Sequence, residues 1–333
     1  MGKTIMNRVL CSISTKGRYH STLPLAIQSV ISQTKKVDKL VIFDDNDNPV
    51  DLRDDAVYKN LFNMMDYKGI AWEWVFAKKK GQHYNHQLAN EMGYEWVWRV
   101  DDDNIAEPTV LETLYSYIRP NIGAIGGQVL TLPLIYENMH YTGKIENINS
   151  EAHIQAQIIK DVREVDHLHC SFLYKAGVHD YNLNLSQVAH REETLFTYGL
   201  KQKGYTLLTV PGGITWHLKN PTGGIRCDTS PVAEKLFIHD DNIFKNIVNF
   251  KEQTIVVLDC GMGDHVVFKH VLPEIDNPVI FSCYPDIVPG RSIGEAKALF
   301  GNLDAYSIYI KMNQWNWKDS VENAFRKLYV RLK

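Results

Sequence analysis

No apolar run in this chain of 333 residues approaches the length of about 18 residues that a membrane-spanning helix needs. Residues 1–8 also lack the apolar core of a secretory signal peptide. We therefore expect a soluble, cytoplasmic protein that at most associates with a membrane surface.

Cysteine is scarce as well: the five cysteines are widely spaced and none form a Cys-x-x-Cys pair. This pattern indicates neither a disulfide framework nor a zinc site, and it favours a reducing compartment. The net charge of −3 gives no overall basic surface. That argues against a protein that holds nucleic acid by bulk electrostatics, although the net charge does not exclude a local basic groove.

Flexible linkers, internal repeats and low-complexity tracts are also missing from the chain. Residues 234–251 contain no glycine, serine or proline, which favours a helical connector over a flexible tether. We expect a large first domain over residues 1–232, a helical connector over 233–253 and a small module over 254–333.

Apolar strand patterns alternate with helical patterns over roughly the first 105 residues, which predicts an α/β fold with a doubly wound sheet. The predicted strands of this part are 9–14, 39–43, 72–77 and 96–100, and its predicted helices are 23–33 and 84–92. Further on, the predicted strands are 122–134, 169–175 and 205–210, and the predicted helices are 109–118 and 192–203.

Three adjacent aspartates, Asp101, Asp102 and Asp103, follow the buried strand pattern of residues 95–100. Neighbouring carboxylates repel one another unless a cation neutralises them, and hard divalent cations prefer oxygen ligands. The carboxyl end of a strand is also where open α/β sheets bind ligands. The triplet therefore predicts a divalent metal site, with a solvated Asp-rich turn as the alternative.

Polar groups also follow the second predicted strand, where Asp44 and Asp45 share a sheet edge with the loop of residues 14–18. Carboxylates there suit a base or ribose, and Lys16 or Arg18 suits phosphate. Lys78, Lys79 and Lys80 precede the helix that bears Asn85, where anions are favoured. Each group can also be read as a polar turn or a solvated face.

Two further elements are ordinary when taken alone. Glu192 and Glu193 open a predicted helix, where acidic residues are common. His217 follows a strand and a Gly-Gly pair, and a single histidine is more often structural than a ligand.

Taken together and in this order, the pieces resemble the family 2 glycosyltransferases over about residues 7–230. The matching pieces are residues 13–18, 29–34, 44–45, 101–103 and 191–194, then His217 and the Pro-Thr-Gly-Gly-x-Arg run at 221–226. The resemblance implies a GT-A fold, with a doubly wound mixed sheet, that takes a nucleoside diphosphate sugar, most simply a UDP-sugar, with Mn²⁺ or Mg²⁺. It implies a hexosyl- or pentosyltransferase.

The resemblance also implies roles for individual residues. Asp103 and His217 would bind the metal, and an imidazole ligand tilts the preference towards Mn²⁺. Glu193 would be the catalytic base of an inverting reaction, with Glu192 as the alternative base and retention as the alternative outcome. The residues expected to bind the donor are Thr15, Arg18, Asp44, Lys80, Asn85, Asp101, Asp102 and Arg226.

No residue names the acceptor, for which a glycan, a lipid, a protein and a hydroxylated base in phage DNA all stay open. His167, His169, Phe172 and Trp216 are candidates to contact it, because aromatic faces stack on sugar or base rings. A core role for Phe172 is an equally good interpretation. Two other function classes are a metal-dependent nuclease or phosphotransferase that uses Asp101 and Asp103, and a non-catalytic sugar-nucleotide or glycan-binding relative.

The carboxyl-terminal part contains the sequence Val-Leu-Asp-Cys-Gly-Met-Gly-Asp at residues 257–264. It resembles the Gly-rich loop of S-adenosylmethionine methyltransferases. The run through residues 263–264, 270–274 and 283–286 also resembles, faintly, one half of a heptosyltransferase-like GT-B fold. About 80 residues are too few for either enzyme. We therefore expect a partial Rossmann-like module that positions the acceptor or mediates self-association into a homo-oligomer.

Overall fold

The computed structural model describes residues 8–133, 135–137, 141–148, 151–218, 223–224 and 230–248, together with three short strands of the carboxyl-terminal part. The chain divides into two compact units, residues 1–248 and residues 249–333. No helix of the described residues is both long enough and apolar enough to cross a membrane.

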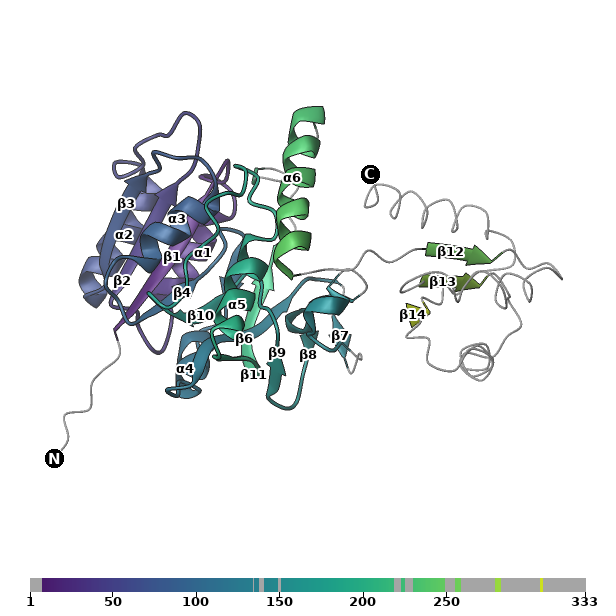
Figure 1. Ribbon diagram of the computed structural model, residues 1–333. Helices are drawn as coiled ribbons and strands as arrows, with labels where there is room; N and C mark the ends of the chain where they lie inside the picture. Colours follow the sequence, from purple (N-terminus) through teal and green to yellow (C-terminus); the bar gives the residue numbers. More distant parts are fainter. Residues whose placement is uncertain are drawn as a thin grey trace. The chain divides into compact units, whose positions relative to one another are not determined.

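The first unit is built on a nine-stranded mixed sheet (Figure 1). Four parallel strands form one side of it in the order β3-β2-β1-β4. They are β1 (Val9–Thr15), β2 (Lys39–Asp44), β3 (Ala71–Phe76) and β4 (Trp96–Arg99). The α/β fold with a doubly wound mixed sheet, predicted from the sequence, is confirmed.

Helices cover both faces of these strands, as the alternation of their buried residues requires. Val9, Cys11 and Ile13 of β1 belong to the core shared with α1 (Leu23–Ile31), α2 (Ala56–Lys68) and α4 (Val110–Ser116). Leu10 belongs to the opposite core, shared with α3 (Gln82–Asn90) and α5 (Glu192–Gln202).

The sheet continues through β10 (Phe172–Lys175), which is antiparallel to both β4 and β6 (Ile122–Leu130). Next comes β11 (Thr206–His217), parallel to β6, with β5 (Asn104–Ala106) and β9 (Arg163–Val165) antiparallel to it. The Gly-Gly pair that precedes His217 lies inside β11, where Gly212 and Gly213 adopt positive φ at a break in register. A single strand therefore brings His217 opposite Asn104, the first residue of β5, directly after the Asp triplet.

Small elements complete the first unit. The strands β7 (Tyr136–Glu137) and β8 (Gln157–Ile158) pair in parallel, beside the 3-10 turns η1 (Ile145–Asn147) and η2 (Ile154–Ala156). The last helix is α6 (Pro231–Val248).

In the second unit the described residues form a parallel sheet of β12 (Ile255–Leu258), β13 (Val279–Ser282) and β14 (Tyr306–Ser307). The Gly-rich segment 259–264 and the predicted terminal helix 320–331 lie outside the described residues. The role of this unit in acceptor positioning or self-association, and the cytoplasmic location, stay predictions.

Candidate functional site

The polar residues singled out in the sequence meet where β1, β2 and β4 end. Because these strands are parallel and adjacent, their carboxyl ends lie at one edge of the sheet. The N–H of Asp45 donates to the carbonyl of Thr15 at 2.8 Å, and the N–H of Val100 donates to the carbonyl of Ser12 at 3.0 Å. The Asp-Asp pair and the residue before the Asp triplet are thus tied to β1.

Asp102 is buried and faces the β1 loop. Its carboxylate accepts from the Thr15 hydroxyl at 2.8 Å and from the Lys16 N–H at 3.4 Å, and it pairs with the Arg18 guanidinium. Burial raises the pKa of Asp102 to about 7; Arg18 opposes this shift and Asp103 adds to it. Asp102 therefore organises the loop that contains Thr15 and Arg18.

Asp103 and His217, the pair expected to bind metal, lie side by side. Asp103 Oδ2 is 3.4 Å from His217 Nε2, and the other ring nitrogen of His217 is 3.3 Å from the Thr131 hydroxyl. Arg18 Nη1 also lies 2.8 Å from Asp103 Oδ2. Burial works to raise the pKa of Asp103, but His217 and Arg18 outweigh it and hold the pKa below its ordinary value.

A carboxylate beside an imidazole suits a divalent cation of Mn²⁺ type. Among the residues that the structure describes, however, no group of three or more His, Cys, Asp or Glu side chains is arranged to hold a metal ion. A metal bound at Asp103 and His217 would need further oxygen ligands from a bound substrate or from water.

Asp44 and Asp45 are buried and serve neighbouring loops. Asp44 accepts from the Tyr19 hydroxyl and from Asn46, through its N–H at 3.1 Å and its side-chain amide at 2.8 Å. Asp45 accepts from the Gly81 N–H at 3.1 Å.

Two more of the expected donor-binding residues complete this edge. Lys80 donates to the carbonyl of Asn46, so the loop before α3 is tied to the loop after β2. Asn85, on α3, donates to the Ser14 hydroxyl at 2.9 Å. Thr15, Arg18, Asp44, Lys80 and Asn85 are thus brought to one sheet edge, whereas Arg226 lies outside the described residues.

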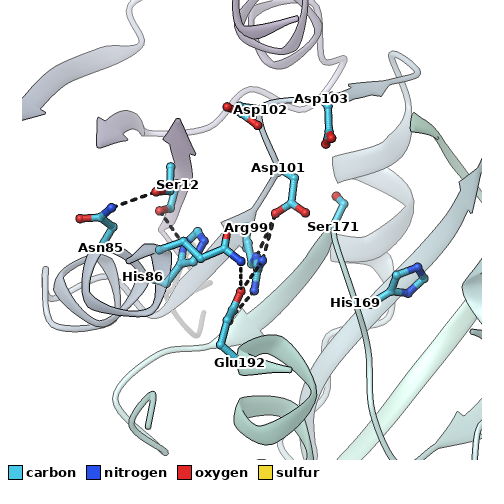
Figure 2. Close-up of polar contacts among 12 residues, drawn as sticks. Ser12, Asn85, His86, Arg99, Asp101, Asp102, Asp103, His169, Ser171 and Glu192 are labelled. Atoms are coloured by element: carbon cyan, nitrogen blue, oxygen red, sulfur yellow. Dashed lines mark hydrogen bonds and ion pairs between the residues drawn. The ribbon is translucent and has the colours of Figure 1, made fainter. Parts of the chain in front are cut away.

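The first aspartate of the triplet is joined to the glutamate pair by a residue that the sequence reasoning did not single out (Figure 2). Arg99, the last residue of β4, is 1% exposed. Its Nη2 lies 3.0 Å from Asp101 Oδ1. The Arg99 guanidinium also bonds both carboxylate oxygens of Glu192, at 2.9 and 2.7 Å. An arginine at the end of an apolar strand, two residues before an acidic triplet, is the sequence signal that could have found it.

The two glutamates of α5 have different surroundings. Glu192 is completely buried and receives, besides Arg99, the side-chain amide of Gln82 at 2.7 Å. Glu193 is half-buried, and its negative charge contributes to raising the pKa of Asp101, after the larger effects of burial, Arg99 and Asp103. Glu193 is therefore the less enclosed member of the pair, and its charge acts on the triplet.

The predicted acceptor contacts separate into core and site residues. Phe172 is fully buried in the core, and Trp216 donates to the Glu107 carboxylate at 3.2 Å. His167 and His169 instead lie together with His153, which no sequence pattern singled out. His153 stacks on His169 with ring centroids 3.8 Å apart and meets His167 edge-on at 5.2 Å.

Among the described residues, the non-glycine residues with positive φ lie just before β10 and just before α5. They are Cys170 (φ 57°), Ala189 (φ 50°) and Arg191 (φ 65°). Burial raises the pKa of the Cys170 thiol and the charges of Asp101 and Glu193 add to it, so this thiol lies near both carboxylates. Backbone strain of this kind persists where the surrounding structure holds it, which is frequent at functional sites.

No protein-family model matches the chain, and no curated protein matches it in sequence. Among solved structures, S. aureus TarS 1-349 in complex with UDP-GlcNAc is similar, with 13% identity and a TM-score of 0.48 over 73% of this chain and 72% of that chain. GalNAc-T7 with UDP, GalNAc and Mn²⁺ has 12% identity and a TM-score of 0.47 over 72% of this chain and 48% of that chain. The match to a longer S. aureus TarS structure spans only 43% of that chain, with 12% identity and a TM-score of 0.47. Similarity at this level assigns no function to the present chain.

Proposed function

We propose that this protein is a GT-A glycosyltransferase that moves a sugar from a nucleoside diphosphate sugar to an acceptor hydroxyl. The observation that carries the proposal is the joining of Asp101 to the Glu192–Glu193 pair through Arg99, while Asp103 of the same triplet lies beside His217. Two proposed metal ligands, a carboxylate proposed to bind the donor, and the candidate base would thereby lie at one sheet edge. The order of motifs that resembles the family 2 glycosyltransferases supports the same function.

The donor would bind at the carboxyl ends of β1, β2 and β4. Asp103 and His217 would hold a divalent cation, Mn²⁺ or Mg²⁺, whose other ligands would be diphosphate oxygens and water. When bound, the cation would neutralise the departing diphosphate. A UDP-sugar is the proposed donor.

The protein side chains at this edge would bind the rest of the donor. Arg18 and Lys80 would add positive charge near the phosphates, with Arg226 as a further contributor. Asp44 would serve the base or ribose, and Asp101 the ribose or sugar. Thr15, Asn85 and Asp102 would contribute as parts of the loops that enclose the donor.

Glu193 is the proposed base. It would take the proton of the acceptor hydroxyl while that oxygen attacks the anomeric carbon and the bond from this carbon to the diphosphate oxygen breaks. One such displacement inverts the configuration and releases the nucleoside diphosphate. Glu192 is unsuited to this task, because it is completely buried and both of its oxygens are engaged by Arg99.

The alternative of a metal-dependent nuclease is less well supported. It would use Asp101 and Asp103, yet Asp101 is bonded to Arg99. The described residues also offer no group of three or more ligands for the paired metals that many nucleases use.

The proposal is tested by incubating the full chain with a panel of UDP-sugars and Mn²⁺ and measuring release of UDP. We expect release with at least one donor, and its loss on chelation with EDTA. Mass spectrometry of products formed with glycan, lipid, protein and hydroxymethylated-DNA acceptors would then identify the acceptor class. Absence of both donor binding and donor hydrolysis across UDP-, GDP-, CMP- and dTDP-sugars would overturn the proposal.

A further inference from the structure

We propose that Arg99 is a positioning residue that divides the glutamate pair, by holding Glu192 as an anchor so that Glu193 alone is presented to the reacting groups. This inference rests on the proposed function, because it assigns a purpose to the geometry of the base. It concerns a residue at the end of β4, in a strand otherwise filled by tryptophan and valine.

All three nitrogens of the Arg99 guanidinium take part in the arrangement. Nη1 donates to Glu192 Oε2 at 2.9 Å, and Nη2 lies 2.7 Å from Glu192 Oε1. Nη2 and Nε also reach Asp101 Oδ1, at 3.0 and 3.3 Å. The planar guanidinium therefore fixes the positions of two carboxylates that lie 91 residues apart in sequence.

The charges are consistent with a paired anion at Glu192. Burial lowers the pKa of Arg99, but Glu192 and Asp101 outweigh it, so the pKa is raised well above its usual value. Burial raises the pKa of Glu192 well above its usual value although Arg99 opposes that shift, so the ionised form rests on the geometry of the pair. Since the guanidinium stays charged and bonds both oxygens, we take Glu192 to be the ionised partner.

Anchoring Glu192 constrains Glu193 through the backbone, because the two are adjacent in the first turn of α5. The turn begins at Arg191 in a left-handed conformation, with φ 65°. The N–H of His190, just before this turn, donates to the carboxylate of Asp240 on α6 at 2.9 Å. The start of α5 is therefore held between β4 and α6, and Arg99 supplies the hold on the side of the Asp triplet.

Asp101 extends this arrangement to the donor end of the site. The same guanidinium that anchors the base-bearing turn bonds the first aspartate of the triplet. Arg99 thus sets the separation between a proposed donor contact and the proposed base. Misplacement of a catalytic group by about 1 Å can lower a rate by about 100-fold.

The test compares Arg99→Lys, Arg99→Met and Glu192→Gln in the full chain, with Arg53→Met, at an exposed arginine, as the control. We expect kcat to fall about 100-fold in Arg99→Lys, which keeps the charge but loses the planar fork, while the KM for the donor changes less than about 5-fold. The kcat of Glu192→Gln should also fall, and the kcat of Arg53→Met should equal that of the wild type.

The double variant Arg99→Met/Glu192→Met separates positioning from mere stabilisation. A well-packed apolar pair can replace a buried ion pair without loss of stability. We expect this variant to regain thermal stability relative to Arg99→Met, yet to keep the low kcat. Recovery of kcat together with stability, or a wild-type kcat in Arg99→Lys, would overturn the inference.

Failure of the proposed function would look different. In that case the wild-type chain would turn over no donor, whereas amide hydrogen exchange would still report the anchor. We expect the amides of the first turn of α5 to lose protection in Arg99→Lys and not in Arg53→Met. Unchanged protection in Arg99→Lys would overturn the anchoring role whatever the reaction is.

Discussion

The carboxylate of Asp240 accepts the N–H of Ser186 at 2.7 Å, which joins α6 to the loop that precedes α5. The same carboxylate also accepts the Ser186 hydroxyl at 2.8 Å, and Asp240 is fully buried. The sequence predicted a helical connector over residues 233–253, and in the structure residues 231–248 form the helix α6, which lies within the first unit. The contacts of Asp240 explain why this helix belongs to that unit.

Asp240→Ala should destabilise the first unit by about 3 kcal/mol, because it leaves the partly buried N–H groups of Ser186 and His190 without their acceptor. Urea unfolding of the full chain, followed by tryptophan fluorescence, measures the change. Asp241→Ala is the matched control, because Asp241 is partly exposed and makes only long ion-pair contacts, at 3.5 Å with Lys245 and 4.0 Å with His190. Equal unfolding midpoints for the two variants would contradict the prediction.

Asp103→Asn and His217→Ala should each weaken Mn²⁺-dependent binding of the donor by at least about 10-fold, because each removes one of two proposed ligands. Calorimetric titration of UDP into the protein, with Mn²⁺ and with EDTA, measures the effect. Asp54→Asn, at an exposed aspartate, is the control and should bind as the wild type does. Metal-dependent affinities that are equal in all four proteins would exclude these two ligands.

Glu193→Gln should abolish sugar transfer while changing the affinity for the donor by less than about 3-fold, because the amide keeps the shape but cannot accept the proton. Single-turnover measurements with saturating donor separate the two effects. A Glu193→Gln protein with wild-type turnover would refute the assignment of the base.

The loops that contain Gly17 and Gly223 contact each other closely. This contact gives a prediction that separates the effect of packing from the effect of backbone strain. A Cβ on Gly223 would lie 2.3 Å from the carbonyl oxygen of Gly17, and Gly223 has φ +76°. Gly93 has nearly the same φ, +75°, but a Cβ added there would meet no atom of the described residues within 4 Å. Both Gly→Ala changes incur left-handed strain of about 1 kcal/mol, but only Gly223→Ala pushes the loops apart.

We therefore expect Gly223→Ala, and not Gly93→Ala, to weaken binding of the donor, since Gly17 adjoins Arg18 in the proposed phosphate-binding loop. Fluorescence titration with UDP under identical conditions compares the two variants. The prediction fails if both variants lose affinity equally or if neither does.

The parts of the fold that sequence could predict are those with a strong local pattern. The apolar runs of β1, β2 and β4 and the helical spacing of α1 and α5 were sufficient. The short strands β5, β7, β8 and β9 were missed, because two or three residues show no periodicity. Helix α2 was also missed, although Tyr58, Leu61 and Met65 have helical spacing and Asp55 caps it.

The residues of the candidate site also divide into those that a local motif predicts and those that only tertiary contacts bring together. The Asp triplet and His217 were visible as motifs, and the structure brings Asp103 and His217 together. The link from Arg99 to Glu192 spans 93 residues and depends on the pairing of β4 with its neighbours, so no local pattern could predict it. His153 was invisible for the same reason, because its contacts with His167 and His169 arise from loop packing.

The burial of His83 should make the stability of the first unit sensitive to mild acid. His83 is fully buried, and neither of its ring nitrogens has a hydrogen-bond partner within the part of the chain that the structure describes. Burial lowers the pKa of His83 from 6.5 to about 4. Between these two values the unfolded chain binds a proton that the folded chain does not, so stability falls as the pH falls through this window.

His83→Leu should reduce the pH dependence of the unfolding free energy by up to about 1.4 kcal/mol per pH unit between about pH 6.5 and about pH 4.5, whatever its effect on stability at neutral pH. Urea unfolding at a series of pH values gives this slope, and the shared titration of the carboxylates cancels in the difference from the wild type. His20→Leu, at an exposed histidine, is the control for the substitution itself. A His83→Leu slope equal to that of the wild type would mean that His83 binds its proton equally well in the folded and unfolded chains, contrary to its burial.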